Sequence, residues 1–264
     1  MIYVSDIAEE LERLAPPELA EPWDNVGLMT GDMEQAVKNI FVCLDVTSEN
    51  VEQAAAFGAD LIISHHPLIF SPVKRIVESD VSGGILRRLI TKNISVYSMH
   101  TNFDKADGGM NDLLAKKLGL SQVRKYTSEE CLDESGKSCD AIGRIGTLPS
   151  PMSMGDYTEQ VKEALNCFSL RSIGEADEQV QTVALCSGAG GDFIYTAYRA
   201  GADVYVTSDV RHHEAQLAQE LGMNLIDAGH FETENIICEF LSGYLFDKFE
   251  DVNVRTSAAI PYFA

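Results

Sequence analysis

Short, continuously apolar runs alternate with helix-like segments along this 264-residue chain, and no other feature constrains its fold as much. Residues 40–44 and 61–63 are apolar enough to be buried strands, and residues 48–57 between them are typical of a helix. A strand, a helix and a strand at this spacing form a βαβ unit, whose parallel strands need cover on both faces of the sheet. A helix near residues 84–91 and a strand at residues 94–97 continue the pattern. We therefore expect an α/β fold.

The second half of the chain repeats this order of elements. Strands are expected at residues 183–186, 204–206 and 224–226, with helices at residues 193–199 and 214–221 between them. The repetition indicates a second α/β unit of the same kind.

The two halves also share short stretches of sequence. Phe57-Gly58-Ala59-Asp60 precedes an apolar triplet and Ser64, and Ala200-Gly201-Ala202-Asp203 precedes an apolar triplet and Thr207. An internal duplication is the simplest explanation. We expect two related three-layer α/β halves with mostly parallel sheets.

The boundary between the predicted halves falls after residue 125. The first half is residues 1–125, and residues 126–264 contain a linker region followed by the second half. The acidic stretch 126–180 is the expected connection, with a strand added at residues 143–148. The C-terminal segment could pack back on the first half.

The chain is strongly acidic, with a formal charge of −21 and a sequence pI near 4.5. Such a surface repels nucleic-acid phosphates and anionic lipids, so nucleic acid and membranes are not expected partners. It also concentrates divalent cations, although a general contribution to solubility explains the charge at least as well.

Cysteine usage and the first residues indicate a cytoplasmic protein. The six cysteines include no C-x-x-C pair, and Cys43 and Cys186 lie in apolar runs, as reduced and buried thiols do. Residues 1–21 contain several acids and no unbroken apolar stretch, so we expect neither a signal peptide nor an anchor. No apolar stretch is long enough to span a membrane.

Histidines are few and follow the predicted strands. His65-His66, His100 and His230 each come after an apolar run, and Asp104 and Glu234 stand four residues after His100 and His230. Ligand-binding groups of open α/β sheets gather at the carboxyl ends of the strands. If the two halves face each other, three or four imidazoles and two carboxylates form a metal site between the halves.

The predicted ligands are imidazoles and carboxylates without thiolates. This set suits Zn, Fe, Mn, Ni or Co and argues against a structural zinc site. Successive side chains diverge, so His65 and His66 fit two ions bridged by a carboxylate better than one ion. The open coordination positions favour catalysis over a structural role. A His-His pair alone is usually surface or core filler, so the prediction depends on the coincidence of histidines, carboxylates and strand ends.

Five segments carry a resemblance to a known family. They are Trp23-Asp24-Asn25-Val26-Gly27-Leu28, His65-His66-Pro67, His100-Thr101-Asn102-Phe103-Asp104, Thr207 to His213 and Gly229-His230-Phe231-Glu232-Thr233-Glu234. Together they resemble the signatures of the NIF-three-like family, whose members are also labelled GTP cyclohydrolase 1 type 2 homologues. The similarity extends over nearly the whole chain. One departure is Thr207-Ser208-Asp209, where the family often has Thr-Gly-Asp.

The resemblance implies a toroidal homohexamer with two divalent metal ions (Fe, Zn, Mn, Ni or Co) in each subunit. The implied metal ligands are His65, His66, Asp104, His230 and Glu234, with Asp104 or Glu234 as the bridge. His100 would be either a further ligand, a neighbour that supports the ligands, or a proton carrier. Some relatives carry a domain inserted at mid-chain, for which the stretch 126–180 is too short.

These residues predict a metal-dependent hydrolase that acts on a small molecule such as a nucleotide. Water held by two ions becomes a nucleophile near neutral pH, and His100 or His213 could carry protons. In a GTP cyclohydrolase the attacked atom would be C8 of guanine. The alternative is a non-enzymatic metal-binding regulatory or metal-handling protein, which would bind the ions without turnover.

Two other segments have alternative interpretations. The loop Gly188-Ala189-Gly190-Gly191, between a strand and a helix, could hold phosphate on backbone N–H groups, although a tight turn is the more ordinary explanation. Arg211, His212 and His213 at a helix start could meet an anionic substrate or form a solvated helix end.

Overall fold

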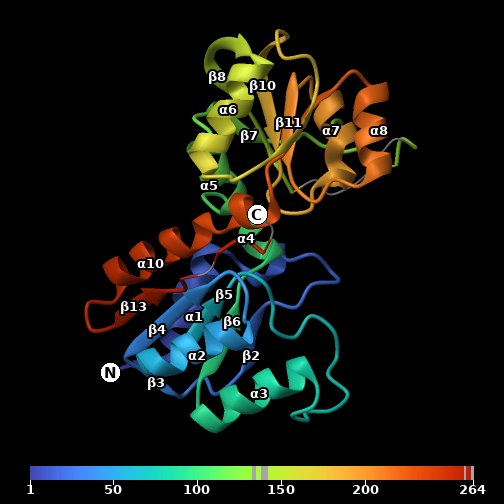
Figure 1. Ribbon diagram of the computed structural model, residues 1–264. Coiled ribbons are helices and arrows are strands. Elements are labelled where there is room, and N and C mark those ends of the chain that lie inside the picture. Colours follow the sequence, from blue (N-terminus) through green and yellow to red (C-terminus); the bar gives the residue numbers. More distant parts are fainter. Residues whose placement is uncertain (133–134, 138–141, 259, 263–264) are drawn as a thin grey trace. The chain divides into compact units, whose positions relative to one another are not determined.

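The computed structural model describes residues 1–132, 135–137, 142–258 and 260–262 (Figure 1). The chain forms two compact units. Unit 1 consists of Met1–Asp107 and Ile237–Ile260, and unit 2 consists of Gly108–Ile236 and Pro261–Ala264. Among the described residues, no helix combines the length and the apolar character that a membrane crossing requires.

Unit 1 is built on a five-stranded sheet with the order β13-β4-β5-β6-β2. These strands are β13 (Asn253–Thr256), β4 (Asn39–Cys43), β5 (Leu61–Ser64), β6 (Ser95–Ser98) and β2 (Gly27–Thr30). The first four run parallel, and β2 is antiparallel to β6. The helices α2 (Ser48–Phe57) and α3 (Val81–Lys92) connect successive parallel strands, which confirms the predicted βαβ pattern. A separate pair of short strands, β1 (Ile2–Tyr3) and β3 (Ala36–Val37), is antiparallel.

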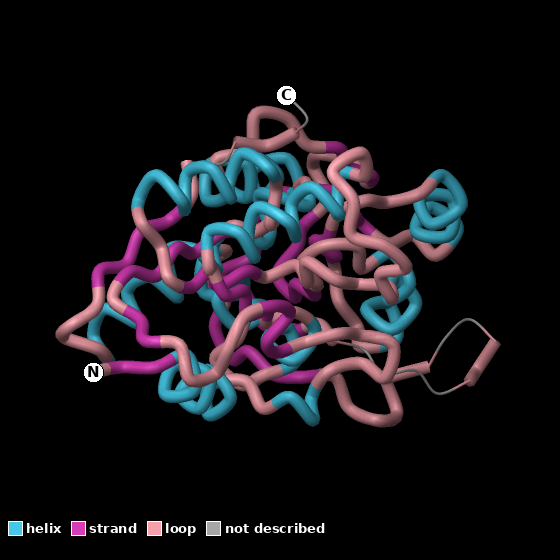
Figure 2. Tube along the Cα trace, turned by 90° about the horizontal axis from the view of Figure 1, so that it is seen from below, coloured by secondary structure: helices cyan, strands magenta, loops and turns pink. Residues whose placement is uncertain are grey.

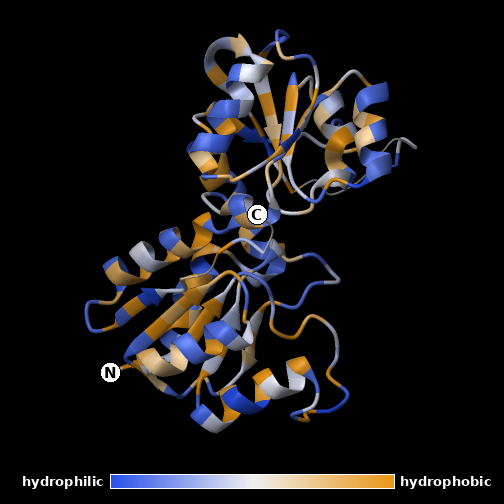
Figure 3. Ribbon diagram, in the orientation of Figure 1, coloured by the Kyte–Doolittle hydropathy of each residue, from blue (hydrophilic) through white to orange (hydrophobic). Residues whose placement is uncertain are grey.

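Both faces of the unit 1 sheet are covered by helices. On one face, side chains of β4, β5 and β6 pack with α2 and α3 in a buried cluster that includes Phe41, Ile62 and Leu89. On the other side, Tyr97 of β6 donates a hydrogen bond to Glu12, on the helix α1 (Val4–Leu14). The helix α10 (Ile236–Lys248) is connected to α1 by a hydrogen bond that Tyr244 donates to Glu10. The strands β4 and β5 are hydrophobic except at Asn39 and Ser64, as a sheet covered on both faces requires (Figure 3).

The last strand returns to the sheet of unit 1. β13 pairs in parallel with β4, with Val254 opposite Ile40. The edge of the sheet in unit 1 is therefore built by residues far apart in the sequence.

Unit 2 is built on a six-stranded sheet with the order β7-β8-β10-β11-β12-β9. Its strands are β7 (Ser121–Lys125), β8 (Arg144–Ser153), β10 (Gln179–Leu185), β11 (Val204–Thr207), β12 (Asn224–Asp227) and β9 (Arg171–Ile173). Only β10, β11 and β12 run parallel; β7, β8 and β9 are antiparallel to their neighbours. The prediction of mostly parallel sheets is therefore wrong for unit 2. Parallel neighbours need a crossover, which α7 (Ile194–Arg199) and α8 (His212–Glu220) supply for these three strands.

Much of the stretch 126–180 is a folded part of unit 2. It contributes β8, α6 (Met154–Leu165) and β9, and the strand predicted at residues 143–148 is confirmed as part of β8. Tyr157 and Val161 of α6 are fully buried in the core of the unit. The acidic residues that suggested a linker are therefore not typical of the whole stretch.

The alternation of side chains along the strands of unit 2 produces two cores. Val183 and Val206 face α6 and α5 (Met110–Lys117), whereas Ala184 and Tyr205 face α7 and α8. The sheet is thus the middle of three layers. Figure 2 distinguishes the helices, strands and loops along the trace.

Candidate metal centre

The parallel strands of unit 1 bring several polar residues to one edge of the sheet. β4, β5 and β6 end at Cys43, Ser64 and Ser98, and they run in the same direction. His65 and His66 directly follow β5, and the Ser64 hydroxyl donates to the His66 carbonyl. The predicted location at the carboxyl ends of the strands is what the fold produces.

His65, His66 and His100 form a compact group at this edge. Their ring centroids lie 5.0 to 5.6 Å apart, and one ligand atom from each ring lies within 4.8 Å of the others. His65 is fully buried, whereas His66 and His100 are partly exposed. The group is therefore open to solvent on one side and anchored in the core on the other.

Each of these imidazoles is oriented through Nδ1. His65 Nδ1 lies 2.8 Å from the Met99 carbonyl, His66 Nδ1 lies 2.7 Å from Asp45, and His100 Nδ1 lies 2.8 Å from Asp24. A proton on Nδ1, donated to these oxygens, leaves the lone pair on Nε2. This is the arrangement in which histidine binds metal ions, with a carbonyl or carboxylate behind the ring.

Asp104 joins the group from the short helix α4 (Thr101–Lys105). Its backbone N–H donates to the His100 carbonyl at 3.1 Å, and its Oδ1 atom lies 3.6 Å from Nε2 of His65. The side chain is largely buried. Unit 1 thus brings together four of the predicted site residues.

Asp24 supports the group from the loop before β2. The carboxylate accepts hydrogen bonds from His100 and from both the backbone and the hydroxyl of Thr101, and its side chain is fully buried. Burial raises the pKa of the Asp24 carboxyl, but the hydrogen bonds from His100 and Thr101 outweigh it and lower that pKa to about 2. Asp24 is therefore a permanent anion behind His100.

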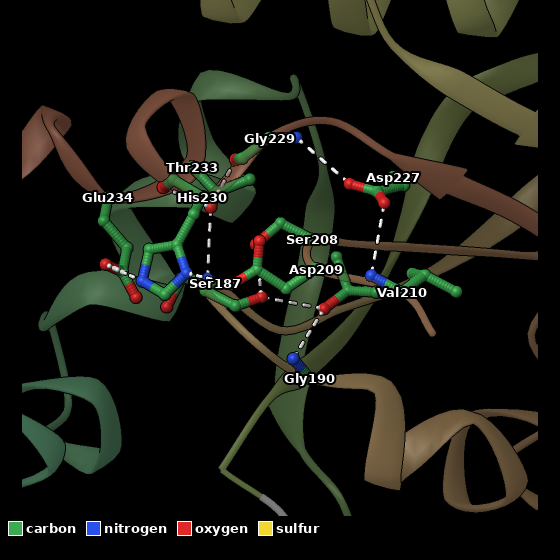
Figure 4. Close-up of polar contacts among 12 residues, drawn as sticks. Ser187, Gly190, Ser208, Asp209, Val210, Asp227, Gly229, His230, Thr233 and Glu234 are labelled. Atoms are coloured by element: carbon green, nitrogen blue, oxygen red, sulfur yellow. Dashed lines mark hydrogen bonds and ion pairs between the residues drawn. The ribbon is translucent and has the colours of Figure 1, made fainter. Parts of the chain in front are cut away.

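In unit 2, His230 and Glu234 are the first and last residues of the short helix α9 (His230–Glu234). This helix follows β12 after a turn at Gly229, whose φ is +88°. Residues four apart share a face of a helix, and Nε2 of His230 lies 2.9 Å from a carboxylate oxygen of Glu234 (Figure 4). In α9 the H-x-x-x-acid pattern thus brings its own histidine and acid together, whereas in unit 1 the acid Asp104 lies 3.6 Å from Nε2 of His65.

His230 is also oriented through Nδ1, which lies 2.7 Å from Asp209 (Figure 4). Asp209 has a left-handed backbone, with φ of +53°. The preceding residue, Ser208, stands where the resemblance leads one to expect glycine. Its buried hydroxyl donates to the Gly188 carbonyl at 2.6 Å. The serine thus ties the loop that carries Asp209 to the glycine loop.

The contacts of the loop 188–191 favour its interpretation as a tight turn over that as a phosphate-binding loop. The backbone N–H of Gly188 donates to Thr233, that of Gly190 donates to Thr207, and that of Ser187 donates to Asn111. A Cβ added to Gly188 would lie 2.1 Å from a carboxylate oxygen of Glu234. The glycines are needed because the protein's own side chains fill this space.

His213 lies in the first turn of α8 with an exposed side chain. Its neighbour Arg211 is bonded to Glu214 and forms an ion pair with Asp192 at 2.8 Å. These contacts are typical of a solvated helix start. The predicted role of His213 as a proton carrier stays a prediction.

A cavity of about 470 Å³ lies beside His230 in unit 2. It is lined by polar residues that include Asp209, Asp227 and Arg171 and by aromatic residues that include Phe231 and Tyr262. Arg171 forms an ion pair with Asp227. This volume is in the usual range for a site that binds a small molecule.

The fold and the site define an α/β protein that carries histidine and carboxylate groups at the carboxyl ends of its strands. A sequence model of the family described as Duf34/NIF3 (NGG1p interacting factor 3) matches residues 2–261. The chain belongs to this family.

Curated relatives and solved structures agree with this assignment. A Clostridium perfringens protein named GTP cyclohydrolase 1 type 2 homolog is 36% identical over 231 residues, which are 88% of this chain and 86% of the relative. A Clostridium acetobutylicum protein of the same name is 34% identical over 88% of this chain and 85% of the relative. The crystal structure of a Bacillus cereus protein related to NIF3 matches with a TM-score of 0.90 and 27% identity, covering 100% of this chain and 99% of that one.

Proposed function

We propose that this protein is a metal-dependent hydrolase that holds two divalent ions on His65, His66, Asp104, His230 and Glu234. The observation that carries the proposal is the orientation of the histidines. The three imidazoles of unit 1 and His230 of unit 2 each have Nδ1 within 2.8 Å of a carbonyl or carboxylate oxygen. Such partners fix the ring and make Nε2 a better metal ligand.

The predicted ligands suit metal ions of intermediate hardness. Asp104 Oδ1 and Glu234 Oε2 lie 3.6 and 2.9 Å from the Nε2 atoms of His65 and His230, so each unit pairs an imidazole with a carboxylate. Burial raises the pKa of the Cys43 thiol well above its usual value, so the folded chain holds this sulfur in its protonated form. Nitrogen and oxygen donors of this kind suit Zn, Fe, Mn, Ni or Co.

When bound, two such ions lower the pKa of coordinated water to about 7 and polarise the group under attack. In this proposal His100 carries protons, and its contact with Asp24 supports that role. Asp24 holds the Nδ1 proton of His100, so that Nε2 can accept a proton and deliver it to a leaving group. The cavity beside His230 accommodates a small molecule, and the names of the relatives suggest a nucleotide as substrate.

We also propose that the active form is a cytoplasmic homohexamer, as the resemblance to the NIF-three-like family implies. The acidic chain carries a formal charge of −21, which favours solubility and disfavours nucleic-acid partners. Sedimentation analysis of the purified protein tests the assembly, and a monomeric mass would contradict it.

The test combines metal content with turnover. Protein purified without chelator is analysed for bound elements, then loaded with Fe, Mn or Zn and supplied with GTP and other nucleotides. We expect about two ions per chain and product formation, and we expect Asp104→Ala and Glu234→Ala to lose both. Glu239→Ala, which removes an exposed acid of α10, is the control and should behave like the wild type.

The outcomes separate the proposals. Full activity in both the Asp104→Ala and Glu234→Ala variants would contradict the hydrolase. Bound metal without turnover of any substrate would support a metal-binding regulatory or metal-handling protein instead.

A further inference from the structure

Two large aromatic side chains stand exposed beside His100 in unit 1. Trp23 is 58% exposed and Phe70 is 54% exposed, although both are large and apolar. Their ring centroids lie 5.9 Å apart, at an interplanar angle of 55°. Each ring also contacts His100, at centroid distances of 6.2 and 6.5 Å. The two rings therefore form an apolar rim next to the histidine group.

The rim is held in place by polar contacts on both sides. Asp24, the neighbour of Trp23, is fixed by His100 and Thr101. The side chain of Asn25 donates to the carbonyl of Ile69 at 2.5 Å, which fixes the residue before Phe70. Trp23 thus supplies one aromatic ring, Asp24 orients His100, and Asn25 restrains the backbone before the second aromatic ring.

Exposed aromatic rings in fixed positions have a cost and a use. Leaving two such rings in water forfeits the stabilisation that their burial would give. Aromatic rings beside a few polar groups are a common feature of small-molecule sites. Because hydrogen bonds already restrain the residues next to these rings, a ligand that stacks on the rings loses little free energy to ordering of the protein.

We propose that Trp23 and Phe70 form a stacking subsite for a planar heteroaromatic ring of the substrate. This inference rests on the proposed function, since it places the ring of the substrate beside the histidines that hold the ions. The continuity of the rim with His100 selects this ligand over a second protein chain. The exposed groups of the rim are two apolar rings, and Lys105 of α4 is engaged by Glu21 at 2.8 Å, which suits a ring better than a phosphate.

Tryptophan fluorescence tests the subsite directly, because Trp23 is the only tryptophan in the sequence. The metal-loaded protein is titrated with guanosine, adenosine, a pterin, GTP and inorganic tripolyphosphate, with excitation at the red edge of the tryptophan band. We expect saturable quenching by the ring compounds and none by tripolyphosphate. Stacking tolerates different rings, so more than one of them should bind.

Two variants complete the test. Phe70→Ala should weaken ring binding about tenfold or more, because one stacking partner is lost. Phe246→Ala removes another exposed phenylalanine of unit 1, on α10, and should bind like the wild type. Circular dichroism confirms that both variants are folded.

Several results would overturn the subsite. They are equal quenching by tripolyphosphate, no saturable response to any ring, and wild-type affinity in Phe70→Ala. A change of oligomeric mass in Phe70→Ala without a change in ring binding would indicate that the face with Trp23 and Phe70 is a subunit interface instead. Binding of ring compounds without turnover would contradict the proposed hydrolase activity but not the subsite. A turnover rate that is the same in Phe70→Ala and in the wild type would contradict the subsite alone.

Discussion

The carboxylate of Asp209 lies 2.7 Å from Nδ1 of His230, on the opposite side of the ring from the Nε2 atom that contacts Glu234. Asp45 has the same relationship to His66 in unit 1, also at 2.7 Å. Each acid acts through the histidine that it holds.

Replacing these acids should weaken metal binding while leaving the ligands in place. We expect Asp209→Asn and Asp45→Asn to lower metal affinity about 10- to 100-fold, because loss of such partners frees the ring and lowers its basicity. Isothermal titration calorimetry with Zn or Mn measures the effect. Asp192→Asn removes an exposed carboxylate that pairs with Arg211 and serves as the control. Unchanged affinity in both histidine-partner variants would argue against the Nδ1 contacts as a determinant of binding.

Gly188 should be required for the position of Glu234. In Gly188→Ala the new methyl group would meet the Glu234 carboxylate, so we expect metal content to fall while the protein stays folded. Gly222→Ala is a matched control, since Gly222 has a similar φ of +64° but no atom within 4 Å of the added Cβ. Both variants carry the same backbone strain, and only the first carries the clash. Equal metal content in the two variants, measured by elemental analysis, would contradict this role.

The buried Arg144 should make Asp112 important for stability. Its guanidinium contacts Asp112 at 2.8 and 3.2 Å, and the Arg144 side chain is only 2% exposed. Asp112→Ala removes an anionic partner from a buried charge, and we expect a loss of about 3 kcal/mol in the free energy of unfolding. Asp80→Ala breaks the exposed pair with Arg75 and should cost less than about 1 kcal/mol. Urea unfolding compares the two, and similar losses would show that burial does not decide the effect.

Glu10 should make part of the protein's stability depend on pH in the acidic range. Hydrogen bonds from Lys248 and Tyr244, and a further one from Arg13, lower the pKa of Glu10 to about 2 against the burial that raises it. The folded carboxyl therefore binds its proton at lower pH than the unfolded one, whose pKa is near 4.5. Its stabilising effect is present above pH 4.5 and is lost as the pH falls towards 2. Glu10→Gln should flatten the melting temperature over this window, and a slope identical to that of the wild type would contradict the assignment.

The regular elements of the α/β units could be predicted because their strands are continuously apolar. Burial on both faces leaves a strong signal in the sequence, as at β4, β5 and β11. The strands β7 and β9 are short and largely exposed, so they carry no comparable pattern. They were missed together with the antiparallel pairing that they bring to unit 2.

The histidines of the candidate site could be predicted because the chain has few of them and they follow strands. Their partner Asp45 could not, because acids are abundant in this chain and only the folded backbone shows which ones stand behind a ring. Asp209 had a signal in the segment Thr207-Ser208-Asp209, without an indication of its contact with His230. Asp24 had a signal in the Trp23-Asp24-Asn25 signature, without an indication of its contact. The glycine loop was ambiguous because a tight turn and an anion site share the same composition.

The path of the chain has a consequence for synthesis. The sheet of unit 1 receives β13 from residues 253–256, after the continuous segment Gly108–Ile236 of unit 2. Domains generally fold as units while the chain is being made. The ribosome therefore releases nearly all of unit 2 while unit 1 still lacks its edge strand and α10. The sheet of unit 1 is therefore completed last, although its first strands are made before any part of unit 2.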